Sequence, residues 1–277
     1  MEISLKRKNL FNVRNKLGEG LFVSKEIKAW VDIGNNRLFY ITHKDLIKHE
    51  TSFKTSVIFG LEKNYLLLGT DLGIIKFDTL NHDTEIKNSF ENIHNVDAFR
   101  SNDGIKIDDY FFLGFMHRKN PTKEKGFLYR IFKNEISLID DSIYIPNTFI
   151  PLSRNELLIS DSFKSEIWLY KFNKNWSLSE KVLWKSLDQS MSPDGGCIVK
   201  DKIFIAMWDD SSVHIFDKKG NFIKRLELDI LKPTNCKFDK NTNSLWITSA
   251  IEDMTEEQLS IYPNSGSVQQ LSIEGFL

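Results

Sequence analysis

The sequence predicts an all-β fold, and three observations support that class. Short runs rich in Ile, Leu, Val, Phe, Tyr and Trp alternate with Asn, Asp, Gly and Ser, which is typical of strands and their turns. The same layout recurs with a period near 46 residues. No stretch shows helical periodicity long enough to carry a fold. A repeat of this length with several strands per unit is typical of a β-propeller.

The repeat can be followed at one equivalent position in each of six segments. Each segment has a short apolar strand, a turn and a second strand that often ends in an aromatic residue and an Asp. The equivalent positions are Val31, Leu68, Gly114, Ser160, Ala206 and Thr248. They are separated by 37, 46, 46, 46 and 42 residues. Six blades of four antiparallel strands use the whole chain at this period, so we expect one six-bladed propeller domain over residues 1–277.

The N-terminal run and two other stretches complete the expected layout. Residues 3–13 would add a strand to the last blade, which closes the ring and removes two open sheet edges. Residues 181–187 and 255–259 could each form about a turn of helix, which is too short to carry the fold.

Composition narrows the class of protein. The chain has 37 Lys and Arg against 38 Asp and Glu and no basic block, which argues against a nucleic-acid surface. Its start lacks the apolar run of a signal peptide, and no apolar stretch approaches the roughly 20 residues that span a bilayer. The two cysteines, Cys197 and Cys236, fit free thiols in a reducing compartment. We therefore expect a soluble cytoplasmic protein, monomeric or weakly homo-oligomeric, without a nucleic-acid or membrane partner.

A set of polar residues precedes the equivalent positions by 12 or 13 residues. In a propeller the innermost strands line a central channel, so such residues would form a ring around one axis. The set is Glu19, Ser56, Asn102, Asn147, Asp194 and Asn235. Buried carboxylates and amide oxygens around one axis would repel one another, and a divalent cation removes that conflict. All-oxygen ligation suits Ca²⁺, Mg²⁺ or Mn²⁺, and Fe²⁺ or Zn²⁺ would be tolerated. The alternative is that each residue only shapes a turn.

Arg100 lies two residues before Asn102, in the run Arg100-Ser101-Asn102-Asp103-Gly104. Residues two apart on an extended segment face the same side, so Arg100 would point into the same channel and donate to oxygens of a ligand. The alternative is a surface ion pair with one of the many acidic residues.

Several short motifs, taken in order, resemble the sugar-lactonase family that includes regucalcin, gluconolactonase and luciferin-regenerating enzyme. The similarity runs from about residue 17 to residue 271. The motifs are Leu17-Gly18-Glu19-Gly20, Trp30-Val31-Asp32-Ile33, Arg100-Ser101-Asn102-Asp103-Gly104, Ile145-Pro146-Asn147, Ser160-Asp161-Ser162, Ser192-Pro193-Asp194-Gly195, Ala206-Met207-Trp208, Lys232-Pro233-Thr234-Asn235-Cys236 and Leu245-Trp246-Ile247-Thr248-Ser249-Ala250.

The resemblance implies a six-bladed propeller with one catalytic divalent metal ion and assigns roles to five residues. By motif, Glu19, Asn147 and Asp194 fall on the family's metal ligands. Arg100 and Asn102 fall on its substrate-contacting pair.

The chain departs from the family pattern at four places. Leu21 stands for the usual proline and Thr148 for the usual glycine. Asp209-Asp210-Ser211-Ser212 replaces a Gly-Gly turn. The loop after Met116, which in some members carries an acidic substrate contact, reads His117-Arg118-Lys119-Asn120.

We therefore expect a metal-dependent hydrolase that opens an aldonolactone to the sugar acid. In this reading Asp194 is the general base as well as a metal ligand, with a pure ligand role as the alternative. Two other functions remain open: a related metal-dependent hydrolase of another ester or a phosphoester, and a metal-binding or interaction propeller without turnover.

Overall fold

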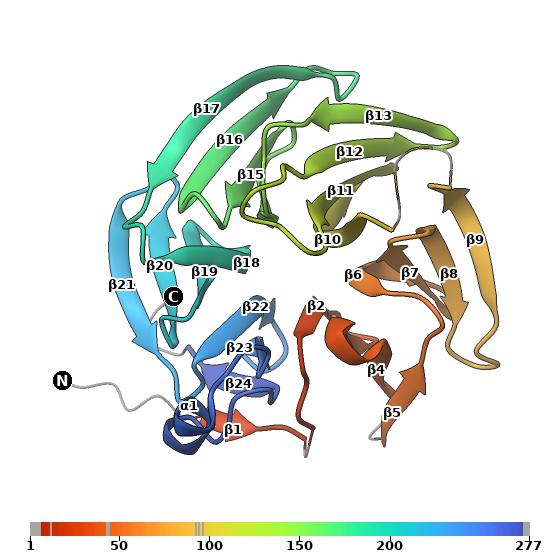
Figure 1. Cartoon of the computed structure of the whole chain (residues 1–277). Coiled ribbons are helices and arrows are strands. Elements are labelled where there is room, and N and C mark those ends of the chain that lie inside the picture. The colour runs from red at the N-terminus through yellow and green to blue at the C-terminus, as the bar shows by residue number, and fades with distance from the viewer. Residues whose placement is uncertain are drawn as a thin grey trace.

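The computed structural model of the chain describes residues 7–11, 13–42, 45–91, 93, 95 and 97–273. Over these residues the chain forms six four-stranded antiparallel sheets. Figure 1 looks down the central axis of the ring of sheets and shows one strand of each sheet at the centre. The predicted six-bladed β-propeller of four antiparallel strands per blade is confirmed.

Each blade uses its strands in chain order from the centre outwards, except the last (Figure 1). From the innermost to the outermost strand, the blades are β2 (Gly18–Val23), β3 (Lys28–Asp32), β4 (Arg37–Thr42) and β5 (Asp45–Glu50); β6 (Thr55–Glu62), β7 (Tyr65–Thr70), β8 (Gly73–Asp78) and β9 (Thr84–Ser89); β10 (Phe99–Ile107), β11 (Tyr110–His117), β12 (Phe127–Phe132) and β13 (Glu135–Asp140); β14 (Pro146–Ser153), β15 (Glu156–Asp161), β16 (Glu166–Phe172) and β17 (Leu178–Ser186); β18 (Ser192–Val199), β19 (Lys202–Trp208), β20 (Ser212–Asp217) and β21 (Phe222–Glu227); and β22 (Lys232–Asp239), β23 (Ser244–Ala250), β24 (Gln269–Ser272) and β1 (Arg7–Asn9).

The last blade is built from both ends of the chain. β1 pairs antiparallel with β24, with Arg7 opposite Leu271 and Asn9 opposite Gln269. The N-terminal segment therefore supplies a strand to the last blade. Of the stretch 3–13 in which we expected this strand, residues 3–6 and 12 lie outside the described residues.

Helices play a small part in the described residues. Residues 33–35 form a short 3-10 helix, η1 (Ile33–Asn35), and α1 (Glu256–Ile261) connects β23 to β24. The helical turn expected near 255–259 is confirmed, and Thr255 and Gln258 form a capping box at its start. No helix of the described residues is long and apolar enough to cross a membrane.

The prediction of a helical turn at 181–187 is wrong, because residues 181–186 belong to strand β17. Its sequence mixes apolar residues with Lys and Ser without strict alternation, so pairing decides its structure. Val182 lies opposite Leu169 of β16, and Trp184 donates from Nε1 to the carbonyl oxygen of Lys218 at 3.1 Å, in the next blade. These contacts override the weak local preference for helix.

Apolar side chains from the second and third strands of each blade fill the space between sheets. Trp30 of β3 stacks on Phe39 of β4 with ring centroids 5.1 Å apart, and Phe112 and Phe204 are fully buried. Burying a side chain of this size contributes about 1.5–3 kcal/mol to stability. This packing between blades holds the inner strands around the axis.

All six inner strands have an irregular register near their first residues. The shifts fall between Glu19 and Phe22, Thr55 and Val57, Ser101 and Gly104, Asn147 and Ile150, Pro193 and Gly196, and Pro233 and Asn235. A β-bulge leaves residues out of the regular ladder and re-aims their side chains. The bulges fall at or directly beside the polar residues that the repeat aligned.

Carboxylates at the ends of second strands fix where two of these inner strands begin. Asp32, which ends β3, accepts hydrogen bonds from the backbone N–H groups of Lys16 and Leu17, both at 3.0 Å, just before β2. Asp161, which ends β15, accepts from Tyr144 at 2.9 Å and Ile145 at 3.2 Å, just before β14. Each carboxylate thus anchors the entry to a strand that carries a polar residue of the ring.

Gly73 is a position where the fold requires glycine. Its φ is +148°, and a Cβ there would lie 1.8 Å from the carbonyl oxygen of Asn88 in the paired strand β9. We expect Gly73→Ala to lower the free energy of unfolding by about 2 kcal/mol or more, because the β8–β9 pairing must shift. Chemical denaturation measures this.

Gly60→Ala is the matched control, because Gly60 lies in β6 of the same blade and a Cβ there would have no atom within 4 Å. We expect its effect to stay within about 0.5 kcal/mol. Equal effects of the two substitutions would contradict the explanation for Gly73.

Candidate functional site

The six polar residues aligned by the repeat lie together, on the six inner strands near their first residues. All six are at least nine-tenths buried: Glu19, Ser56, Asn102, Asn147, Asp194 and Asn235. We call this set the ring, and we call the end of the channel at which the inner strands begin the ring mouth. The structure thus brings every sequence-predicted site residue except Arg100 into the ring itself, and Arg100 lies beside it.

Contacts at the level of the ring join inner strands on one side of the channel. The Ser56 hydroxyl donates to the Ser101 hydroxyl at 2.7 Å, which links β6 to β10. Asn102 Nδ2 donates to Asn147 Oδ1 at 2.8 Å, which links β10 to β14. The side chains of neighbouring blades therefore orient one another.

The contacts continue on the other side of the channel. The Thr234 hydroxyl donates to the carbonyl oxygen of Gly18, which links β22 to β2. Gly195 lets Asn235 approach β18, since a Cβ at Gly195 would lie 2.3 Å from the Asn235 amide carbon. The ring is therefore closed by close packing as well as by hydrogen bonds.

Asn147 is held in one orientation from two sides. Its Oδ1 accepts from Asn102, and its Nδ2 donates to the Ser162 hydroxyl at 2.9 Å. Ser162 in turn donates to the carbonyl oxygen of Pro193 at 2.7 Å. These bonds fix which face of the Asn147 amide carries oxygen, and its Oδ1 keeps a second lone pair for a ligand.

Arg100 is half-buried at the ring mouth and bonds directly to the ring. Its Nη1 donates to Asn102 Oδ1 at 2.7 Å and to the carbonyl oxygen of Ser101 at 3.0 Å. Asn102 Nδ2 also donates to the carbonyl oxygen of Pro146 at 3.0 Å, so both amide hydrogens of Asn102 are used within the protein. Asn102 therefore orients its neighbours, and only its oxygen can accept a further bond.

The ring region holds carboxylates whose charge is costly. Burial, and then the negative charge of Asp103, raise the pKa of the Glu19 carboxyl from 4.5 to about 8. Burial and the charges of Glu19 and Asp103 raise the pKa of Asp194 well above its ordinary value. Burial raises the pKa of Asp103 to about 6, and the positive charge of Lys237 opposes this. Three carboxyl groups thus lie within electrostatic reach of one another.

Asp103 is a residue that our sequence reasoning missed, although the signal was present. It lies in the run Arg100-Ser101-Asn102-Asp103-Gly104, from which we took only Arg100 and Asn102. Because β10 has a bulge between Ser101 and Gly104, both Asn102 and Asp103 leave the regular ladder. The alternation of a regular strand would have sent them to opposite faces.

Two buried oxygen atoms of the ring make no hydrogen bond to any residue that the structure describes. They are Oδ1 of Asp194 and Oδ1 of Asn235. Unpartnered buried oxygens beside carboxylates of raised pKa are the environment that a bound cation neutralises. The donor set is mixed, since no three His, Cys, Asp or Glu side chains in the described ranges form a metal-binding group. Carboxylate and amide oxygens suit a hard divalent cation.

Thr148 adopts a backbone conformation that favours glycine. It follows Asn147 in the bulge of β14 and has φ of +81°. This conformation costs a β-branched residue about 1–3 kcal/mol. Its hydroxyl donates to the carbonyl oxygen of Asp194 at 2.8 Å and lies 2.8 Å from the Ser160 hydroxyl. The threonine thus ties the backbone beside Asn147 to the backbone of Asp194.

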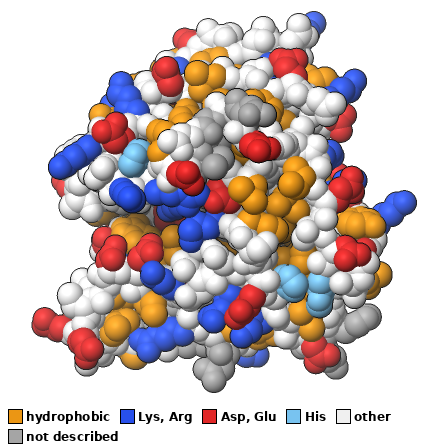
Figure 2. Space-filling model, turned by 45° about the vertical axis from the view of Figure 1, so that its right-hand side comes forward, with side chains coloured by type: hydrophobic (Ala, Val, Ile, Leu, Met, Phe, Trp, Pro, Cys, Tyr) orange, Lys and Arg blue, Asp and Glu red, His pale blue; other side chains and the backbone are white. Residues whose placement is uncertain are grey.

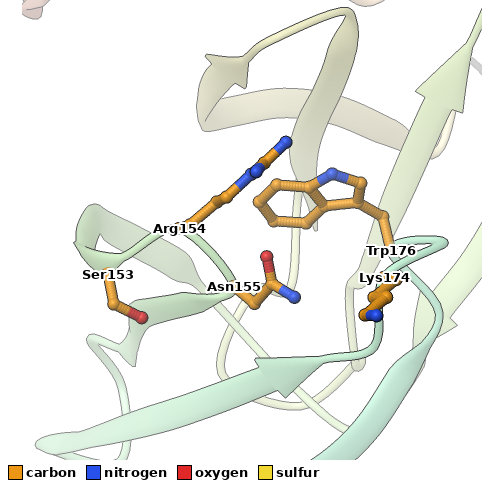
Figure 3. Close-up of a pocket in the computed structure, with 5 residues that line it drawn as sticks. All are labelled: Ser153, Arg154, Asn155, Lys174 and Trp176. Carbon is orange, nitrogen blue, oxygen red and sulfur yellow. The ribbon is translucent and has the colours of Figure 1, made fainter.

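A cavity of about 280 Å³ runs from the ring into the channel. It is lined at the ring by Gly20, Asp103 and Asn235, and farther along the inner strands by Lys106 and Lys237. A second cavity of about 540 Å³ lies beyond the other end of β14, in loops that hold Arg154 and Trp176 (Figure 3). The ring residues do not line this larger cavity, so its size alone does not mark the candidate site.

The sequence matches one protein family over most of its length. Residues 17–251 match the family model described as the SMP-30/Gluconolactonase/LRE-like region. Regucalcin of Gallus gallus is 30% identical over 97 residues, which are 34% of this chain and 32% of that protein. The match therefore spans about a third of the length of this relative.

Solved structures show the same fold at low sequence identity. Regucalcin of Agrobacterium tumefaciens, a calcium-binding protein, has a TM-score of 0.86 at 22% identity and covers 95% of this chain and 92% of its own. A luciferin-regenerating enzyme has a TM-score of 0.85 at 16% identity, covering 97% and 95%. A gluconolactonase of Xanthomonas campestris has a TM-score of 0.73 at 15% identity, covering 97% and 89%.

Proposed function

Because the chain belongs to the SMP-30/gluconolactonase/LRE-like family, we propose that it hydrolyses a sugar lactone with the help of one divalent metal ion. The gluconolactonase among the similar structures supports the reaction class, and the calcium-binding regucalcin supports a metal. The sugar-lactonase family predicted from the sequence motifs is confirmed by the family match. The identity of the metal and of the sugar belongs to the proposal.

The observation that carries the proposal is the pair of buried ring carboxylates, Glu19 and Asp194. Neither faces a cation of the protein as a direct ion-pair partner among the described residues. Burial disfavours their ionised forms, and Asp194 keeps one oxygen without a hydrogen-bond partner. A propeller that served only as a scaffold would not need two such groups in its channel.

Three residues would hold the metal: Glu19, Asn147 and Asp194. Their oxygens fit Ca²⁺, Mg²⁺, Mn²⁺, Zn²⁺ or Fe²⁺. When bound, the ion supplies Lewis-acid polarisation of the lactone carbonyl group.

Other groups of the chain would bind the substrate and move the proton. Arg100 donates to hydroxyl oxygens of the sugar, while its Nη1 keeps Asn102 in place. Asn102 accepts from a sugar hydroxyl through Oδ1. Asp194 takes the proton of the attacking water, whose oxygen adds to the carbonyl carbon. The C–O bond of the lactone then breaks, Asp194 returns the proton to the leaving oxygen, and the new carboxylic acid releases its proton to solvent. The products are the carboxylate and a free hydroxyl of the opened sugar acid.

The proposal is tested by following acid release at constant pH. Glucono-, galactono-, xylono- and arabinonolactone are each given to EDTA-treated protein with and without Ca²⁺, Mg²⁺, Mn²⁺, Zn²⁺ or Fe²⁺. We expect opening above the spontaneous rate that requires metal. If the folded protein binds metal but opens none of the lactones, another ester or phosphoester becomes the better substrate class. If it binds no metal, a non-enzymatic propeller becomes the better interpretation.

The Ser162→Ala variant tests whether the orientation of Asn147 matters. Losing the hydroxyl removes the acceptor for Asn147 Nδ2, so the amide can turn and present nitrogen instead of oxygen to the metal. We expect metal affinity, measured by calorimetry, to fall by about 10–100-fold.

Ser153→Ala is the control for this prediction. Its hydroxyl lies at the far end of β14 and donates to the Glu156 carboxylate at 3.0 Å. We expect its metal affinity to match the wild type. Unchanged affinity in Ser162→Ala would show that Ser162 does not orient a metal ligand.

A further inference from the structure

We propose that the lactone carries an anionic group, a carboxylate or a phosphate, and that Arg118 and Lys54 bind this group at the ring mouth. The inference rests on the proposed function, because it names the substrate class of the same site. It starts from the loop after β11, which reads His117-Arg118-Lys119-Asn120 where some members of the family carry an acidic substrate contact.

Strand pairing places three cationic residues at the ring mouth. Lys54 immediately precedes β6, and Arg100 is the second residue of β10. β11 runs antiparallel to β10 with Met116 opposite Arg100, so Arg118 lies just past this pair. The backbone N–H of Arg118 donates to the carbonyl oxygen of Ala98 at 2.8 Å, which fixes the start of its loop.

The three cationic groups lie within electrostatic reach of one another. Burial lowers the pKa of Lys54, and the positive charges of Arg100 and Arg118 lower it further. The charge of Arg118 also acts on Arg100. Figure 2 shows Lys and Arg side chains gathered beside a hollow of the molecular surface. Like charges so placed favour an anionic ligand between them.

Among the described residues, the protein's own carboxylates neutralise only part of this positive charge. Asp71 Oδ2 accepts from Arg118 Nη2 at 2.5 Å. Oδ1 of Asp71 is buried without a partner among the residues described. Lys54 Nζ donates to neutral groups instead, the carbonyl oxygen of Ile33 and Oδ1 of Asn36, both at 3.2 Å.

Glu252 and the ring carboxylates do not remove the positive excess. Glu252 raises the pKa of Lys54 but also lies 3.9 Å from Lys16 Nζ, a further cation. Glu19 and Asp194 attract Arg100, yet under the proposed function a divalent metal ion balances their charge. Three cations, Lys54, Arg100 and Arg118, then lie at the ring mouth, where Asp71 pairs with Arg118 and the charge of Glu252 acts on both Arg100 and Lys54.

The chemistry of these side chains suits an oxyanion of the substrate. A guanidinium presents paired N–H donors that match a carboxylate or a phosphate, and a lysine ammonium adds a point charge. A neutral lactone would leave both groups facing only hydroxyls. We therefore expect selectivity for lactones that carry a charge away from the reacting ester.

The test compares three lactones under the same metal conditions. Gluconolactone is neutral, galactarolactone carries a carboxylate and 6-phosphogluconolactone carries a phosphate. We expect kcat/KM for at least one anionic lactone to exceed that for gluconolactone by about 10–1,000-fold, mainly through KM. The better of the two anionic lactones identifies the anion.

Four variants distinguish binding by Arg118 from a purely structural pair with Asp71. Arg118→Gln should lower the ratio of anionic to neutral kcat/KM by about 10–100-fold, and Arg118→Lys should restore part of it. Lys119→Gln, at the exposed neighbouring position, should leave the ratio unchanged. Asp71→Asn should keep the preference, because Arg118 stays charged. If Arg118→Gln and Asp71→Asn lower all three rates equally, the pair only anchors the loop and the inference is wrong.

A binding measurement separates this inference from the proposed activity. Calorimetry with Ca²⁺ compares gluconate with galactarate and 6-phosphogluconate, each with one more anionic group than gluconate. We expect at least about tenfold tighter binding of one of them, lost in Arg118→Gln. This result without turnover of any lactone would refute the lactonase and keep the anion site. Hydrolysis of neutral and anionic lactones at equal kcat/KM would keep the lactonase and refute the anion site. Equal binding of all three acids would also refute it.

Discussion

The Asp194→Asn variant is expected to lose metal-dependent lactone hydrolysis by at least about 10³-fold while it keeps its fold. Asparagine has nearly the same shape but carries no charge and cannot accept the proton of the attacking water. It also contributes a weaker oxygen to the metal. Acid release at constant pH measures the rate, and calorimetry measures the loss of metal affinity.

The fold of this variant should be intact for a physical reason. Burial and the neighbouring carboxylates disfavour the Asp194 charge, so a neutral side chain relieves repulsion in the metal-free protein. We expect a melting temperature in EDTA at pH 7.5 that is equal to or above that of the wild type. Metal, in contrast, should stabilise the wild type and leave the variant nearly unchanged.

Asp201→Asn is the matched control for this substitution. Asp201 lies in the turn between β18 and β19 of the same blade, and its side chain is 87% exposed. This variant should hydrolyse lactone at the wild-type rate. If Asp194→Asn kept more than about a tenth of the activity, Asp194 would be neither the base nor an essential ligand.

Metal-free protein is expected to become less stable as the pH rises from about 5 to 8.5, and divalent metal should remove most of this loss. Folding raises the pKa of Glu19 from 4.5 to about 8 and that of Asp103 to about 6. At a pH between the unfolded and the folded pKa of each group, the folded protein keeps a proton that the unfolded chain releases. The free energy of unfolding therefore falls as pH increases, and the full contribution is present only below the unfolded-chain pKa values of 4.5 for Glu19 and 3.8 for Asp103.

Melting curves in EDTA and in Ca²⁺ across this pH range measure the effect. We expect a drop in melting temperature on the order of 5 °C or more in EDTA, since one pKa unit corresponds to about 1.4 kcal/mol. The Glu19→Gln variant should flatten the curve, because its side chain does not titrate. Glu26→Gln, an exposed residue before β3, should follow the wild type. Parallel curves for wild type and Glu19→Gln would contradict the raised pKa of Glu19.

The fold was predictable because the repeat is carried by buried strands. Val31, Ser160 and Thr248 lie in the second strands β3, β15 and β23, where burial on both faces demands a compact apolar run. The outermost strands carry a weaker signal. β17 is half-exposed and mostly polar, so its sequence alone did not separate a strand from a turn of helix.

The positions of the ring were predictable, but its internal arrangement was not. Counting back from the equivalent position of each segment finds the ring residues, because each blade repeats the distance between the bulge of its inner strand and its second strand. Which side chains then bond to each other depends on contacts between blades, such as Asn102 with Asn147 or Thr148 with Asp194. These pairs are 45 and 46 residues apart in the sequence, and no local pattern links them.

The pairing of β1 with β24 has a consequence for the order of events during synthesis and folding. Arg7 is synthesised long before its partner Leu271. Strand β1 therefore cannot pair in the sheet of β22–β24 until β24 has been made. Contacts of this sequence separation carry a large loop-closure entropy and slow folding. A nascent chain stalled before β24 would hold the strands of the other five blades while β1 stayed unpaired.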